Sequence, residues 1–150
     1  MPGAAIRWAQ GPADVDGAIA LREEVFVREQ NVPAEEELDG RDEDALHLVA
    51  LDPADPARVI GTLRLLFDGA TVKVGRVAVE QGWRRQGLAA AMLEEALAEG
   101  RRHGCTRARL ASQVEVVPLY ERAGFTVESA VFEEAGIPHV WMGRPLGDLA

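Results

Sequence analysis

The pattern of apolar and polar residues predicts a domain in which short strands and amphipathic helices follow one another. Apolar residues at helical spacing from Val15 to Phe26 indicate a first helix, with Asp14 as its N-cap and an end near Glu29. A second apolar stripe follows Gly87, and Gly104 marks its end. The predicted helices are 14–29, 87–103 and 115–123, and the predicted strands are 6–9, 45–51, 59–67, 71–79, 107–112, 125–132 and 140–144.

The three strands between residues 45 and 79 are joined by short turns. The connections, Asp52–Pro56 and Asp68-Gly69, are too short for a parallel crossover, so an antiparallel meander is expected. The 150 residues contain 47% hydrophobic residues, enough for one core. We therefore expect a single domain spanning residues 1–150, with mixed α/β architecture.

Composition excludes several kinds of partner. The net charge of −9 argues against nucleic acid and favours small cationic molecules. The sequence has neither the 18 to 20 continuous apolar residues of a membrane helix nor the pattern of a leader peptide, which predicts a cytoplasmic protein with no membrane partner. Cys105 is the sole cysteine, so no internal disulfide and no cysteine-based metal site can form, and no metal is expected.

The junction VGRVAVEQGWRRQGLAAA at residues 74–91 carries the first functional signal. A Val-rich strand passes into a loop with Gly and Arg, and a helix opens directly after Gly87. The first amides of a helix have no helical partner, and the positive end of the helix dipole favours anions. Arg84 and Arg85 are either solvated or phosphate ligands, and we favour the ligand role for one of them. The loop lacks the Gly-Lys-Ser/Thr ending of a Walker sequence.

The order of elements around this junction resembles the GCN5-related N-acetyltransferase (GNAT) family across nearly the whole chain. The family pattern Arg/Gln-x-x-Gly-x-Gly/Ala is met by residues 84–89, and the segment 109–113 is followed by a Tyr120 helix and a Gly124-Phe125 turn. Further similarity to the ElaA-like subgroup lies in residues 25–30, 39–42, 75–77 and 134–139.

The resemblance implies a fold, a cosubstrate and a set of residues. The implied fold is an α/β (α+β) mixed, mostly antiparallel sheet of six to seven strands flanked by about four helices, with splayed central strands. The implied cosubstrate is acetyl-CoA, and Tyr120 is the implied catalytic acid for the departing thiolate. A core aromatic is the alternative for Tyr120. The implied acetyl-CoA ligands are Val77, Val79, Arg84, Arg85, Gln86, Gly87, Leu88, Ala89 and Gln113.

The acceptor side is less defined by the sequence. Residues 29–44 contain eight carboxylates and one Arg, and this acidic segment is either a solvated loop or a site that attracts an ammonium group. His47 and His139 are candidate bases or structural histidines, and Arg64 and Arg76 are either ion-paired or ligands. The candidate substrate-binding residues are Glu29, Asp39, His47, Arg64, Arg76 and His139.

The expected reaction is direct acetyl transfer to a small-molecule amine in a ternary complex, by a monomer or homodimer. A non-catalytic acyl-CoA sensor and a plain interaction domain are the alternatives, because fold alone does not prove activity. The presence of Tyr120 favours an enzyme over a sensor.

Overall fold

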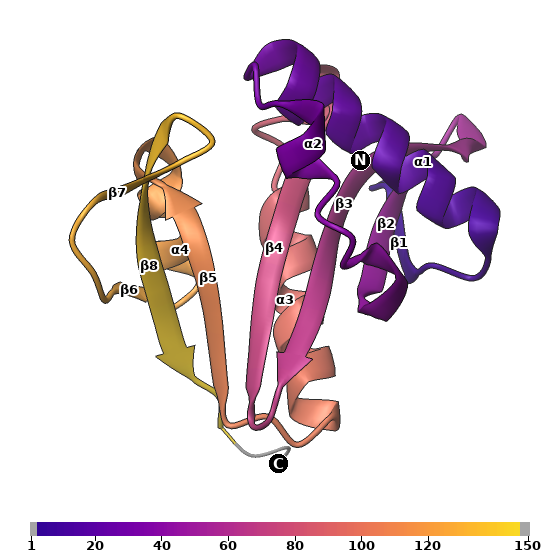
Figure 1. The fold of residues 1–150 in the computed structure, drawn as a ribbon. Coiled ribbons are helices and arrows are strands. Elements are labelled where there is room, and N and C mark those ends of the chain that lie inside the picture. The colour runs from indigo at the N-terminus through magenta and orange to yellow at the C-terminus, as the bar shows by residue number, and fades with distance from the viewer. Residues whose placement is uncertain (1–2, 148–150) are drawn as a thin grey trace. The chain divides into compact units, whose positions relative to one another are not determined.

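The structure of the protein is a computed structural model that describes residues 3–147 (Figure 1). The chain forms two compact units. The first unit contains residues 1–64 and 76–92, and the second contains residues 65–75 and 93–150, so that the strands β3 and β4 contribute to both. The elements are β1 (Ala5–Trp8), α1 (Pro12–Arg22), the π-helix η1 (Glu23–Glu29), α2 (Ala34–Glu37), the 3₁₀ turn η2 (Asp42–Asp44), β2 (Leu46–Asp52), β3 (Asp55–Asp68), β4 (Thr71–Val79), the 3₁₀ turn η3 (Gln81–Trp83), α3 (Leu88–Arg102), β5 (Arg107–Gln113), the 3₁₀ turn η4 (Val114–Val116), α4 (Val117–Arg122), β6 (Thr126–Val127), β7 (Phe132–Glu134) and β8 (Ile137–Pro145).

The strands form one mixed sheet in the order β1-β2-β3-β4-β5-β8-β6, with β7 paired to β8. Two-residue connections join β2 to β3 and β3 to β4, which permits only antiparallel pairing. The parallel pair is β4–β5, in register from Thr71 with Arg107 to Lys73 with Arg109. The predicted mixed, mostly antiparallel fold is thus confirmed, and residues 3–147 contain four α-helices and eight strands instead of six to seven strands.

The extra strand arises because the predicted strand 125–132 is broken into β6 and β7. The backbone N–H of Trp141 on β8 donates to the Ser129 hydroxyl at 2.9 Å, and Glu128 N–H donates to Trp141 O at 2.8 Å. A side-chain hydroxyl thus takes the place of a ladder carbonyl, and the regular pairing stops there.

The first helix begins two residues before the predicted N-cap and changes its hydrogen-bonding pattern midway. Pro12 occupies the first turn, where its missing N–H is not needed, and Gly11 is the capping residue instead of Asp14. The carboxylate of Asp14 accepts hydrogen bonds from Arg7 and from the Gln10 amide. From Glu23 the helix continues as seven residues of π-helix, a form that is rare and often found at functional sites.

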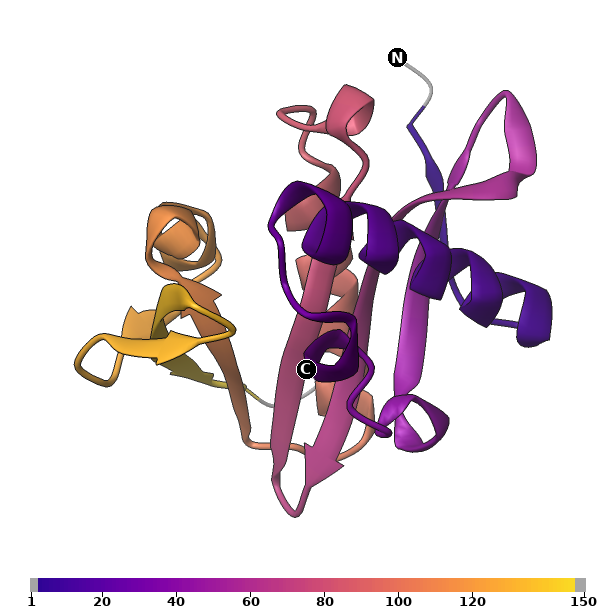
Figure 2. The ribbon, with the colours of Figure 1, turned by 45° about the horizontal axis from the view of Figure 1, so that its top comes forward.

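In the first unit, α1 crosses β2 and β3 on one face of the strands and α3 begins on the opposite face (Figure 1, Figure 2). Close approach of α1 depends on Gly17, because a Cβ there would lie 2.6 Å from Cγ2 of Val59. The apolar cluster beneath α1 joins helix and strand side chains, namely Ala18, Leu21, Val25, Val49, Leu51, Val59 and Ala78.

In the second unit, β5 and β8 pair antiparallel over seven residues, from Arg107 with Pro145 to Gln113 with His139. The helix α4 has Pro118 in its first turn, where the missing N–H is not needed. Its Tyr120 ring packs edge-on against Phe125, with 6.1 Å between the ring centroids. Within residues 3–147, no helix combines the length and the apolarity needed to cross a membrane.

Candidate functional site

The junction between β4 and α3 forms a loop that exposes the start of a helix. After β4 ends at Val79, η3 and residues 84–87 lead into α3, and Arg85 and Gly87 have left-handed φ angles of 63° and 82°. The N–H of Ala91 makes the first α3 bond, to Gly87 O at 3.0 Å, so the helix itself offers no carbonyl partner to the preceding amides of Leu88 and Ala89. These amides lie at the corner where the sequence predicts anion binding, and that binding stays a prediction.

Gly87 leaves open space at this corner. A Cβ built on Gly87 meets no described atom within 4 Å, so an incoming group can approach the backbone closely. The Gln86 side chain bonds within the loop, donating from Nε2 to Gly82 O at 3.3 Å. We call residues 84–89 the cradle.

The two arginines of the cradle differ in their surroundings. Arg84 donates from Nε to Val79 O at 2.8 Å and pairs through Nη2 with Glu29 at 3.0 Å. The side chain of Arg85 is exposed, with no hydrogen bond or ion pair to any residue between 3 and 147. Arg85 is therefore available to a ligand, whereas Arg84 is already engaged at two of its three nitrogens.

The strand leading to the cradle is irregular at Arg76, which has a left-handed φ of 53°. Such a residue interrupts the extended backbone of a strand, as at a β-bulge. Val77 and Val79 beyond it are half-buried, and Ala78 between them is buried. The Arg76 side chain leaves the strand toward α2.

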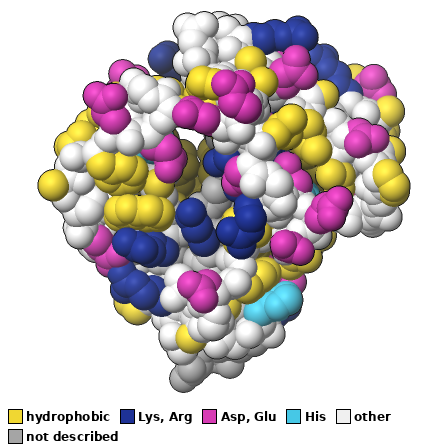
Figure 3. All heavy atoms as spheres, viewed as in Figure 1, with side chains coloured by type: hydrophobic (Ala, Val, Ile, Leu, Met, Phe, Trp, Pro, Cys, Tyr) yellow, Lys and Arg dark blue, Asp and Glu magenta, His cyan; other side chains and the backbone are white. Residues whose placement is uncertain are grey.

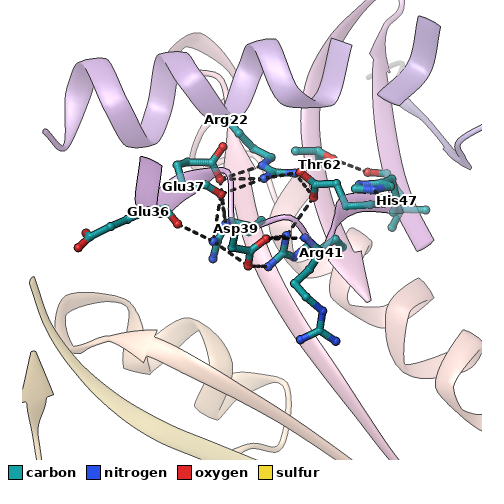
Figure 4. A network of polar contacts seen from close by, with 11 residues as sticks. Arg22, Glu36, Glu37, Asp39, Arg41, His47 and Thr62 are labelled. Atoms are coloured by element: carbon teal, nitrogen blue, oxygen red, sulfur yellow. Dashed lines mark hydrogen bonds and ion pairs between the residues drawn. The ribbon is translucent and has the colours of Figure 1, made fainter. Parts of the chain in front are cut away.

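Beside this strand lies a network of three arginines and three carboxylates, all in the first unit (Figure 4). Arg22, at the end of α1, is 1% exposed and contacts Glu37 Oε2 at 2.9 Å and Asp42 Oδ1 at 2.8 Å. Arg76 donates from Nε to Glu37 Oε2 at 2.8 Å. We call Arg22, Glu37, Asp39, Asp42, Arg64 and Arg76 the arginine–carboxylate network.

Arg64 completes the network from β3. Its Nη1 donates to Asp39 Oδ1 and to Asp42 Oδ1, both at 2.9 Å, and its Nη2 pairs with the second oxygen of Asp39. Arg76 also reaches Asp39, at 3.3 Å. Three positive and three negative side chains are thus joined, and their formal charges balance.

The network shifts the pKa values of Asp39, Asp42 and Arg64. Hydrogen bonds from Arg64 hold the pKa of Asp39 far below its ordinary value, against the opposing effect of burial. Burial alone would raise the pKa of Asp42, but the hydrogen bonds and charge of Arg22 and then of Arg64 lower it. Burial opposes the charge of Arg64, but bonds to both aspartates raise the pKa of that guanidinium. Asp39, Asp42 and Arg64 therefore stay ionised at neutral pH.

These contacts divide the acidic segment into two parts. Residues 34–37 form the helix α2, which the sequence does not predict, and Glu37 at its end is 3% exposed. Glu35 and Glu36 are exposed, and Figure 3 shows Asp and Glu side chains over α2. The part that enters the network is paired with arginines, and the exposed part is solvated.

The candidate substrate residues of the first unit therefore contact the network or the cradle. Asp39, Arg64 and Arg76 lie together in the network, and Glu29 pairs with Arg84 of the cradle. The buried His47 shares a hydrogen bond between Nε2 and Asp42 O at 2.9 Å, and its Nδ1 is buried without a partner among the described residues.

In the second unit, the structure brings Gln113 and His139 together as cross-strand neighbours on β5 and β8. The His139 ring is held by a contact of Nδ1 with Ile137 O at 2.7 Å and stacks on Phe132. Figure 3 shows basic side chains over β5, where the Arg109 guanidinium lies 4.1 Å from the centre of the Trp141 ring.

Tyr120, on α4 of the second unit, is buried, and its burial raises the pKa of its phenol above the ordinary value. The phenol thus keeps its proton at neutral pH, as a general acid must.

The sequence interpretation missed two members of the network, Arg22 and Asp42, as functional candidates. Arg22 gave a usable signal, because it occupies an apolar position in the helical pattern of the first helix. A charged residue on a core-facing stripe indicates a buried ion pair. Among residues 3–147, no group of three His, Cys, Asp or Glu side chains is placed to hold a metal ion.

Comparison with known proteins agrees with this architecture. A model of the acetyltransferase (GNAT) domain matches residues 13–145. The uncharacterized N-acetyltransferase YjcF of Bacillus subtilis is 36% identical over 138 residues, which cover 89% of this chain and 94% of YjcF. An acyl-CoA N-acyltransferase from Pseudomonas aeruginosa has a similar structure, with a TM-score of 0.81, 32% identity and coverage of 93% of this chain and 99% of that one.

The structure of Escherichia coli ElaA is also similar, with a TM-score of 0.81, 26% identity and coverage of 93% of this chain and 99% of ElaA. The family predicted from the cradle and the Tyr120 segment is thereby confirmed. The chain belongs to the GNAT family of acetyltransferases and is an acyltransferase enzyme.

Proposed function

We propose that the protein transfers the acetyl group of acetyl-CoA directly to the amine of a small molecule in a ternary complex. The observation that carries the proposal is the cradle, in which unpaired helix amides, an open Gly87 and an exposed Arg85 meet at one loop of a GNAT domain. An anion with several oxygens fits this set of donors.

The cradle residues suit a pyrophosphate in chemistry and in space. The amides of Leu88 and Ala89 would hold it, Gln86 would shape the loop, and Arg85 would add charge. The backbone of Val77 and Val79 and the side chain of Gln113 are the proposed contacts of the pantetheine arm. Bound acetyl-CoA supplies the activated thioester.

Direct transfer is favoured because the chain offers no activated nucleophile at Cys105. That side chain is 5% exposed, and burial raises the pKa of its thiol, which keeps it protonated and weakly nucleophilic. Tyr120, protonated at neutral pH, is the proposed donor of a proton to the departing thiolate.

The acceptor amine must lose a proton before it attacks. His139 is the better proposed base, since Nε2 of His47 already contacts Asp42 O, whereas Nε2 of His139 has Glu134 as a distant neighbour at 3.9 Å. Attraction of a cationic acceptor to the acidic segment would come from Glu35 and Glu36, because the Asp39 charge is balanced by Arg64 and Arg76.

The test combines coenzyme binding and turnover. Acetyl-CoA should raise the melting temperature of the parent, because a ligand of the folded state shifts unfolding. Gly87→Glu should abolish this rise by placing a side chain and a negative charge in the open corner. Thiol release from acetyl-CoA, measured with a panel of amines, then identifies the acceptor.

Gly69→Glu is the matched control. Gly69 has a left-handed φ of 59° and open space at its Cβ, like Gly87, but lies in the β3–β4 turn. The Gly69→Glu variant should have backbone strain similar to that of Gly87→Glu, and acetyl-CoA should still stabilise it. Equal loss of stabilisation in both variants would refute the cradle, and stabilisation without turnover of any amine would favour the sensor alternative.

A further inference from the structure

The ion pair between Glu29 and Arg84 connects two segments that are far apart in the sequence. Glu29 is the last residue of the π-helix η1, and Arg84 is the first residue of the cradle. Nη2 of Arg84 lies 3.0 Å from each carboxylate oxygen of Glu29, while Nε donates to Val79 O at 2.8 Å. Both side chains are about one-third exposed, at 32% for Glu29 and 37% for Arg84.

Two anchors fix the plane of the Arg84 guanidinium. The Val79 carbonyl holds one nitrogen and the Glu29 carboxylate holds a second, which leaves Nη1 as the nitrogen without a contact among the described residues. A guanidinium is a rigid planar fork, so fixing two nitrogens also sets the direction in which the third donates. An arginine on a flexible stem would otherwise sample many rotamers.

We propose that Glu29 is a positioning residue for coenzyme binding, which holds Arg84 so that its free nitrogen donates to the pyrophosphate in the cradle. This assignment rests on the proposed function. It differs from the role in acceptor binding that the sequence suggests for Glu29, because its carboxylate is engaged by the cradle. The net charge of the Glu29–Arg84 pair is zero. Arg84 therefore contributes a correctly oriented hydrogen-bond donor, while Arg85 and the helix amides contribute the electrostatic attraction to the pyrophosphate.

Removing Glu29 has two opposing effects, which a pair of variants separates. Loss of its negative charge should favour a bound pyrophosphate, whereas loss of the anchor should disfavour it. Glu29→Gln and Glu29→Ala both remove the charge, but only the Gln variant keeps an oxygen that can accept from Nη2. We expect the Kd for coenzyme A to be about fivefold higher in the Ala variant than in the Gln variant, the ratio typical of one hydrogen bond.

Two further measurements test whether the effect passes through Arg84 and the pyrophosphate. In an Arg84→Ala background, the Gln and Ala variants should bind coenzyme A equally. With S-acetylpantetheine, which lacks the pyrophosphate, the two single variants should have equal affinities. Glu29→Asp keeps the charge but shortens the reach, and should bind coenzyme A more weakly than the parent.

Glu23→Ala is the structural control. Glu23 begins the same π-helix and pairs with Arg28 at 3.4 Å, with both side chains more than half exposed. Glu23→Ala should leave the affinity for coenzyme A unchanged. If weakening η1 by itself lowered this affinity, Glu23→Ala would lower it as well.

Equal Kd values for Glu29→Gln and Glu29→Ala, or a difference that persists in the Arg84→Ala background, would overturn the assignment. In a different outcome, the parent binds coenzyme A, Gly87→Glu does not, and Glu29→Gln and Glu29→Ala have equal Kd values. That result would support the cradle as the coenzyme site and refute only the positioning role of Glu29. If the parent does not bind coenzyme A, the proposed function and the role of Glu29 fail together.

Discussion

Glu37→Gln should strongly destabilise the first unit, because it removes one charge from the buried part of the arginine–carboxylate network. The carboxylate is 3% exposed and lies within 3.0 Å of nitrogens on both Arg22 and Arg76. Arg22 is itself 1% exposed, so the variant leaves a buried guanidinium with reduced compensation.

The expected magnitude follows from the contacts that remain. Breaking a buried ion pair from one side typically destabilises by about 3–5 kcal/mol. Arg22 keeps Asp42 at 2.8 Å, and the Gln amide oxygen still accepts one hydrogen bond. We therefore expect a loss of stability at the lower end of this range, about 3 kcal/mol. This loss corresponds to a fall in melting temperature of roughly 6–12 °C for a chain of this size.

Thermal unfolding followed by circular dichroism measures this change, with Glu36→Gln as the control. Glu36 precedes Glu37 in α2, but its side chain is exposed and points away from the network (Figure 4). Its contact with Arg76 uses the backbone carbonyl, which the substitution keeps. The control should change stability by less than about 0.5 kcal/mol. A Glu37→Gln melting temperature within about 2 °C of the parent, or equal falls in both variants, would refute this account of the network.

Further predictions concern the catalytic acid, the acid sensitivity of the network and the packing of α1. Tyr120→Phe should lower kcat by about 10²-fold or more with little change in the Kd for acetyl-CoA, and unchanged turnover would exclude Tyr120 from the mechanism. Because the pKa of Asp39 is depressed in the folded state, its stabilising contribution is present above the ordinary value of 3.8 and is lost as the pH falls through the folded pKa. Asp39→Asn should thus be less stable than the parent at pH 7, with a gap that closes in acid-unfolding curves below pH 3.8; a gap independent of pH would contradict this. Gly17→Ala should destabilise by about 1 kcal/mol in urea unfolding, since the clash with Val59 at 2.6 Å outweighs the gain in helix propensity; a more stable variant would show that Val59 moves freely.

The sequence by itself determined the elements whose signals are local. The strand predicted at 71–79 is β4, and the helix predicted at 87–103 differs from α3 by one residue at each end, because apolar periodicity and a terminal Gly act over a few neighbouring residues. The cradle was found for the same reason, since a strand, a Gly-containing loop and a helix start are consecutive in the chain. The family was predicted from this pattern together with the Tyr120 segment and the order of the elements.

Only the tertiary structure decided which charged side chains meet. Arg22 and Glu37 lie 15 residues apart, and Glu29 and Arg84 lie 55 apart, so no local period relates them. The acidic segment has a sequence typical of a solvated loop, and Glu37 is buried because arginines from α1 and β4 surround it. The energy of a carboxylate depends on burial and on the distance to opposite charges, and both quantities exist only once distant segments have packed together.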